Sequence, residues 1–175
     1  MPDPRYPIGR FEWKGALSDD ERRWAIEVIA HTPDELRTAV EGLEEEQLDT
    51  PYREDGWTVR QVVHHIPDSH LNAYVRMKLA LTEDEPLVKP YDEAAWAELV
   101  DSKGPVIGSL QLLTVLHERW VRLMRSMSPE DFARRFRHPE YPDAPRSLDW
   151  LLALYAWHGP HHVAQINALR QRKGW

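Results

Sequence analysis

The chain has 175 residues, of which 42% are hydrophobic and 29% charged, as expected for a globular protein with its own hydrophobic core. Its net charge of −7 argues against a nucleic-acid-binding surface, which needs clustered lysine and arginine, and disfavours anionic membranes for the same reason. The sequence contains no cysteine, so a disulfide, a cysteine zinc ligand and a cysteine nucleophile are all excluded.

The N-terminal segment, residues 1–17, contains three prolines and two glycines and has no apolar stretch of the kind found in signal peptides. We expect this segment to form an extended arm. The longest uninterrupted apolar run, residues 151–157, is too short to span a membrane. The sequence therefore predicts one cytoplasmic domain over residues 1–175.

The first of four segments with helical periodicity begins at Ser18 and ends near Leu43. Glu21 follows Ser18 by three positions, which is the spacing of a capping box at a helix N-terminus. Thr32 and Pro33 interrupt the segment in the way that an N-cap residue and a first-turn proline would. We expect either a kink at this point or two abutting helices.

The second segment begins at Thr58, again with a capping-box partner, Gln61, three positions later. Pro67 lies inside this segment and should bend the helix, because proline has no N–H to donate to the carbonyl four residues before it. The third segment begins at Ser109 and ends near Ser126.

The fourth segment begins at Ser147 and ends at Gly174, a residue type common at helix C-termini. Two long, proline-rich connections, residues 83–108 and 134–146, separate these helical segments, and the first should contain a short helix over 92–101. No segment shows the alternation of a convincing β-strand. The sequence thus predicts an all-α fold, a four-helix bundle with long crossover connections.

Two histidines of the fourth helix, His158 and His162, lie on its apolar, core-facing side, whereas His161 lies away from the centre of that side. Imidazoles at positions i and i+4 can bind one metal ion together. Burial of two imidazoles without partners would cost roughly 1–3 kcal/mol each, and a bound cation would avoid both costs. The alternative is that each is a hydrogen-bonded core histidine.

A third metal ligand is expected on another helix. His65 is the best candidate, because it begins a polar strip that borders the core face of the second helix. His117, on the apolar face of the third helix, and His70 are rival ligands, and His117 could instead line a pocket. The remaining histidines are expected outside the core: His64 on the outer face of its helix, and His31 and His138 on the surface.

Six segments of the chain closely resemble the YfiT branch of the DinB superfamily, and the likeness extends over essentially its whole length. They are YPIG (6–9), LDTPYRE (48–54), WTVRQVVHHIPDSHLNAYVRMKLALTE (57–83), KPYDEAAWAELVDS (89–102), LHERW (116–120) and YAWHGPHHVAQINALRQRKGW (155–175).

This resemblance implies a four-helix bundle that holds one divalent metal, zinc or nickel, through three histidines, here His65, His158 and His162. Members are often cytoplasmic homodimers and are described as metal-dependent hydrolases, and related members are thiol transferases that use bacillithiol or mycothiol. Gly159 and Pro160 depart from expectation, because both residue types are unfavourable between two ligands of a regular helix.

The function predicted first is thiol S-transfer. A cation held by three histidines keeps an open position, and there it can lower the pKa of a small thiol such as bacillithiol for attack on an electrophile. Arg76 or Arg119 could bind a carboxylate of that thiol, and His117 is a further candidate for substrate binding.

The second prediction is metal-dependent hydrolysis of an amide or ester by activated water. Such sites usually need a carboxylate as general base, but position 159, between the two helical ligands, is glycine. Because this carboxylate is absent, hydrolysis ranks second. Asp68 and Glu118 are the nearest candidates for a general base by helix position. A non-catalytic bundle that binds a metal or another ligand is the third prediction.

Overall fold

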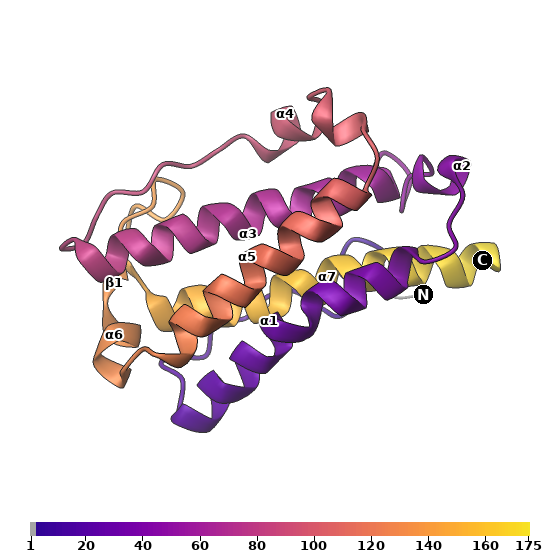
Figure 1. Ribbon diagram of the computed structural model, residues 1–175. Coiled ribbons are helices and arrows are strands. Elements are labelled where there is room, and N and C mark those ends of the chain that lie inside the picture. The colour runs from indigo at the N-terminus through magenta and orange to yellow at the C-terminus, as the bar shows by residue number, and fades with distance from the viewer. Residues whose placement is uncertain (1–2) are drawn as a thin grey trace.

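The computed structural model describes residues 3–175, and four long helices within this range form a bundle (Figure 1). They are α1 (Asp19–Val40), α3 (Val59–Thr82), α5 (Ile107–Arg125) and α7 (Leu148–Lys173). Both α1 and α3 pack against α5 and α7, so α1 and α3 lie on one diagonal of the bundle. The predicted all-α, four-helix-bundle fold is confirmed.

Short elements occupy the connections between the long helices. They are α2 (Glu45–Leu48), α4 (Glu93–Ala97), the 3-10 helix η1 (Asp101–Lys103), α6 (Pro129–Ala133), and the strands β1 (Arg135–Phe136) and β2 (Arg146–Ser147). The two strands form a small antiparallel pair that the sequence did not predict. The short helix expected over 92–101 exists as α4, which ends at Ala97 and is followed by η1.

The predicted helix starts depend on side-chain caps, and most are confirmed. Each cap side chain accepts a hydrogen bond from the backbone N–H three residues later: Ser18 from Glu21, Thr58 from Gln61, and Ser147 from Trp150. Gly174 ends α7 with a left-handed backbone, φ 73°. The start predicted at Ser109 is wrong, because α5 begins two residues earlier and Ser109 lies inside it.

Three of the long helices contain an internal proline and continue through it, namely α1 at Pro33, α3 at Pro67 and α7 at Pro160. Of the two alternatives predicted at Thr32 and Pro33, two abutting helices are therefore excluded. The Thr32 hydroxyl donates to the carbonyl of Val28 within α1 instead of capping a new helix. Each proline leaves one carbonyl of the preceding turn without its helical N–H partner.

Two apolar clusters fill the bundle, one toward each end. One contains Ile29, Met77, Trp120 and Leu152, and the other contains Leu36, Val63, Leu113 and Ile166. Between them lies a polar layer, here called the histidine layer, formed by His65, His70, His117, His158 and His162. The long helices thus place five imidazoles across the middle of the core.

Gly159 allows α7 to approach α1 closely at this layer. A Cβ atom at position 159 would lie 2.6 Å from Cγ2 and 2.8 Å from Oγ1 of Thr32. Any larger residue would require the Thr32 side chain or one of the two helices to shift, which accounts for the unexpected glycine between His158 and His162.

The N-terminal arm has no helix over its described residues and runs antiparallel to α7. The Arg5 carbonyl accepts a hydrogen bond from Gln165, and the Gly9 carbonyl accepts one from Trp157. Within residues 3–175 no helix combines the length and apolar character that a membrane crossing would require.

Candidate metal centre

Three histidines from two helices converge in the histidine layer. One ring nitrogen from each of His65 on α3 and His158 and His162 on α7 lies within 4.8 Å of the other two. The Nε2 atoms of His65 and His158 are 3.3 Å apart. No carboxylate oxygen of residues 3–175 belongs to this group. Three imidazole nitrogens suit zinc or nickel, so the donor set fits a divalent transition metal.

The environment keeps these three rings neutral. Burial lowers the pKa of His65 to about 4. Burial and, secondarily, the neighbouring imidazoles lower the pKa of His158 and His162 well below the ordinary value of 6.5. Neutral imidazole is the form that binds a cation, so the site requires no deprotonation at pH 7.

Gln165 fixes the orientation of His162. Its side-chain N–H donates to the Arg5 carbonyl at 3.0 Å, which leaves the amide oxygen free to accept from Nδ1 of His162 at 2.8 Å. A proton on Nδ1 leaves the lone pair on Nε2, the nitrogen available for a metal. The N-terminal arm therefore contributes to the geometry of the site.

The two rival ligands of the sequence prediction, His70 and His117, do not join the three converging histidines. Both are buried on the far side of His158, where His70 contacts its Nδ1 atom at 3.1 Å and His117 contacts His70 at 2.8 Å. They are placed to act on the site through His158.

Two other histidine predictions are wrong. His64 was expected on the outer face of α3, but it is buried and lies within hydrogen-bond distance of Ser109 and of the Gly104 carbonyl, because the connection after α4 covers that face. His138 was expected on the surface and is also buried. His31 is exposed, as predicted.

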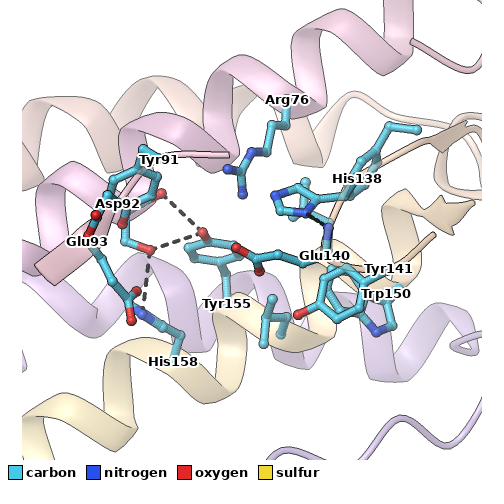
Figure 2. Close-up of a pocket in the computed structure, with 14 residues that line it drawn as sticks. Arg76, Tyr91, Asp92, Glu93, His138, Glu140, Tyr141, Trp150, Tyr155 and His158 are labelled. Carbon is cyan, nitrogen blue, oxygen red and sulfur yellow. Dashed lines mark hydrogen bonds between the residues drawn. The ribbon is translucent and has the colours of Figure 1, made fainter. Parts of the chain in front are cut away.

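A cavity of about 370 Å³ opens beside His158 (Figure 2). Its walls come from α3, from the segment around α4, from the connection that contains β1, and from α7. The lining residues that can form hydrogen bonds or ion pairs are Ser69, Arg76, Tyr91, Asp92, Glu93, His138, Glu140, Tyr141, Trp150, Tyr155 and His158. Of the three converging histidines, His158 therefore faces a polar and aromatic chamber.

Hydrogen-bond donors also face this chamber. Within the described chain, neither Nε of Arg76 nor the hydroxyl of Tyr91 has a hydrogen-bond partner, although both atoms are buried. Nδ1 of His138 accepts from the backbone N–H of Glu140, which places the His138 proton on Nε2. In Figure 2 the Arg76 guanidinium and the His138 ring lie next to each other, away from His158. These donors suit a carboxylate or another anionic group.

Acidic side chains also line the cavity. The pKa of Glu93 is raised by partial desolvation beside the cavity and by the negative charges of Glu140 and Asp92, although its side chain remains exposed to solvent. In Figure 2 Glu93 and His158 lie toward the same end of the cavity. Helical periodicity could not identify Glu93 or Glu140 as site residues, because both lie outside the four long helices.

The other predicted residues divide into two groups. Arg76 lines the cavity. Asp68 is partly buried on α3, and burial together with the charge of Asp101 raises its pKa to about 6, but it does not line this cavity. Glu118 and Arg119 are exposed on α5, and Glu118 lines a separate hollow between α1 and α5. The structure does not bring these last three residues to the converging histidines.

Comparison with known proteins gives consistent matches over the whole chain. The family model of the DinB superfamily matches residues 29–166. Proteins from Bacillus mycoides (strain KBAB4) and Bacillus cereus (strain B4264), each named "Putative metal-dependent hydrolase", are 51% identical over the full length of both chains. The structure of YfiT from Bacillus subtilis, described as "a probable metal-dependent hydrolase with an unusual four-helix bundle topology", matches with 47% identity, 98% coverage of each chain and a TM-score of 0.95.

Proposed function

The chain belongs to the DinB superfamily, and we propose that it is a metal-dependent enzyme whose His65, His158 and His162 hold one divalent cation, zinc or nickel. One observation carries the proposal: three neutral imidazole nitrogens converge, and one of the three rings, His158, lines a cavity large enough for a small substrate. A bound divalent cation would supply a Lewis acid that lowers the pKa of a thiol or a water molecule.

The first proposed reaction is transfer of a low-molecular-weight thiol, such as bacillithiol, to an electrophile. The thiol proton is released, the sulfur forms a bond to carbon, and the electrophile loses a leaving group or opens its ring. Arg76 and Tyr91 would bind a carboxylate of the thiol, because both offer a buried donor without a protein partner in the described chain. The chain contains no cysteine that could compete for the cation.

Hydrolysis of an amide or ester is the second candidate, and Glu93 is the observation that favours it. A carboxylate with a raised pKa that lines the same cavity as His158 could accept a proton from water. The sequence prediction ranked hydrolysis lower because it found no suitable carboxylate, and Glu93 supplies one. The names of the relatives from Bacillus mycoides and Bacillus cereus agree with this alternative.

The experiment compares both reactions on one preparation. Metal-free protein is loaded with zinc or nickel and given either bacillithiol with an epoxide or bromobimane, or a set of model esters and amides. Thiol consumption above the protein-free rate, absent in His158→Ala, is the expected result. Ester or amide hydrolysis without thiol consumption would show that the protein is a hydrolase and not a thiol transferase. Absence of both activities in metal-loaded protein would favour the non-catalytic bundle.

The proposed reaction also suggests where and how the protein works. A thiol co-substrate must stay reduced, as it does in the cytoplasm. We propose a homodimer, because apolar side chains are exposed on the outer faces of two helices: Leu71 and Val75 on α3, and Leu112 and Val115 on α5. Light scattering of wild type and Leu112→Lys would test this, and a monomeric wild type would reject it.

A further inference from the structure

The nitrogen of His158 that does not face His65 is connected to a buried series of hydrogen bonds. Nδ1 of His158 lies 3.1 Å from Nε2 of His70 on α3, and Nδ1 of His70 lies 2.8 Å from Nε2 of His117 on α5. Nδ1 of His117 lies 2.7 Å from the carbonyl oxygen of Ile29 on α1. This histidine chain, His158–His70–His117–Ile29 carbonyl, therefore crosses all four long helices.

The carbonyl at the end of the histidine chain is available because of the sequence of α1. The N–H that would normally bond to the Ile29 oxygen belongs to residue 33, which is proline. Pro33 leaves this buried acceptor without a partner from its own helix, and His117 donates to it instead. The internal proline of α1 thus creates the fixed end of the histidine chain.

A backbone oxygen can only accept a hydrogen bond. This determines which nitrogen carries the proton on each neutral ring of the histidine chain. His117 must carry its proton on Nδ1 to donate to Ile29, which leaves a lone pair on its Nε2. His70 then donates from Nδ1 to that lone pair and accepts on Nε2 from Nδ1 of His158. His158 keeps its lone pair on Nε2, the atom 3.3 Å from Nε2 of His65.

Packing holds the inner rings in the orientation that these bonds require. The ring planes of His70 and His117 differ by 14° and their centroids are 4.9 Å apart, as in an edge-to-edge N–H···N bond. Tyr155 and Trp120 pack against the His70 ring at interplanar angles of 88° and 86°. A flip of the His70 ring would break both of its hydrogen bonds and disturb this packing.

We infer that His70 and His117 are positioning residues of the metal centre: with the Ile29 carbonyl they hold His158 as its Nδ1–H tautomer, so that the Nε2 lone pair points toward the cation. The inference rests on the proposed metal site. The histidine chain ends on a backbone oxygen, which cannot release a proton. Its role is therefore to orient His158 and make it a stronger ligand rather than to conduct protons.

Two pairs of variants of the full chain test this inference. His117→Phe and His70→Leu remove the hydrogen bonds but keep a bulky apolar side chain, whereas His117→Gln and His70→Gln retain a donor and an acceptor. We expect the apolar variants to bind zinc about 10–100-fold more weakly in competition with a chromophoric chelator. The glutamine variants should recover most of that affinity. Unchanged affinity in the apolar variants, or equal loss in both members of a pair, would overturn the inference.

His64→Leu is the matched control. His64 is also a buried α3 histidine with two hydrogen-bond partners, Ser109 and the Gly104 carbonyl, but it lies outside the histidine chain. This variant should bind zinc with nearly wild-type affinity. A loss equal to that of His70→Leu would show that any buried imidazole of α3 has the same effect, which would also overturn the inference.

A second measurement needs neither variants nor metal. Nitrogen-15 NMR of metal-free wild-type protein should show His158, His70 and His117 protonated on Nδ1, with protons that exchange slowly with solvent. A proton on Nε2 of His158 would overturn the inference even if the protein binds zinc. Correct Nδ1 protonation in a protein that binds no zinc or nickel would instead refute the proposed metal site, and the inference with it.

Discussion

The chemistry of the site depends on which nitrogen of each imidazole carries its proton. The Arg5 carbonyl, through Gln165, determines the protonated nitrogen of His162. The Ile29 carbonyl, through the rings of His117 and His70, determines the protonated nitrogen of His158. Helical spacing alone predicts that His158 and His162 share a face, since that depends only on the 3.6-residue period. It cannot predict the hydrogen-bond partners, because these come from other helices and from the arm.

Arg76 gives a prediction at the same scale. Arg76→Gln should raise the KM for a carboxylate-bearing thiol about 10-fold or more and leave metal content unchanged, because a charge-assisted hydrogen bond to the substrate is lost. The KM for the carboxamide analogue of the thiol should differ little between wild type and variant. Arg119→Gln, which changes an exposed arginine of α5, is the control. Equal effects of the two arginine substitutions would remove Arg76 from the substrate site.

At the scale of helices, sequence reasoning located all four long segments because each carries strong periodicity and three carry predicted cap residues. At Thr32–Pro33 it could not choose between a kink and two abutting helices, and packing of a continuous α1 against α5 and α7 excludes the second of these. It also missed the cavity walls, since Glu93 lies in the short helix α4 and His138 in an irregular connection, and neither segment is long enough for a period to indicate which side chains face inward.

The contact between α1 and α7 yields a stability prediction with a definite sign. Alanine normally stabilises a helix by about 1 kcal/mol relative to glycine. Gly159→Ala should nevertheless lower the free energy of unfolding by about 1–3 kcal/mol, because its Cβ would meet Thr32 at 2.6 Å. Urea denaturation of the double variant Thr32→Ala/Gly159→Ala should show much of this loss recovered. Additive effects of the two substitutions would contradict the proposed contact.

Across the whole molecule, the histidine layer makes the metal-free protein sensitive to acid. Burial lowers the pKa of its five imidazoles, to about 4 for His65 and for His117, whereas in the unfolded chain they titrate near 6.5. Below pH 6.5 the unfolded state therefore binds more protons than the folded state. The free energy of unfolding must then fall as pH is lowered toward 4.

Each such histidine contributes a slope of up to about 1.4 kcal/mol per pH unit. Asp68 and Glu93 act in the opposite direction, because a raised pKa favours the protonated, folded state as pH falls, through about 6 for Asp68. Both of these side chains are at least partly exposed, whereas four of the five histidines are buried. Urea denaturation between pH 7.5 and 5 should show a clear net loss of stability without metal. A stability that is constant or rises over this range would show that the rings are not buried in neutral form.

Metal content tests the central claim most directly. Protein purified after exposure to zinc or nickel should contain about one ion per chain by elemental analysis. His65→Ala, His158→Ala and His162→Ala should each lose it while retaining their helical circular dichroism. His64→Ala, which removes a neighbouring buried imidazole outside the group, should keep it. Unchanged metal content in the three ligand variants, or loss of metal in His64→Ala alone, would contradict the account.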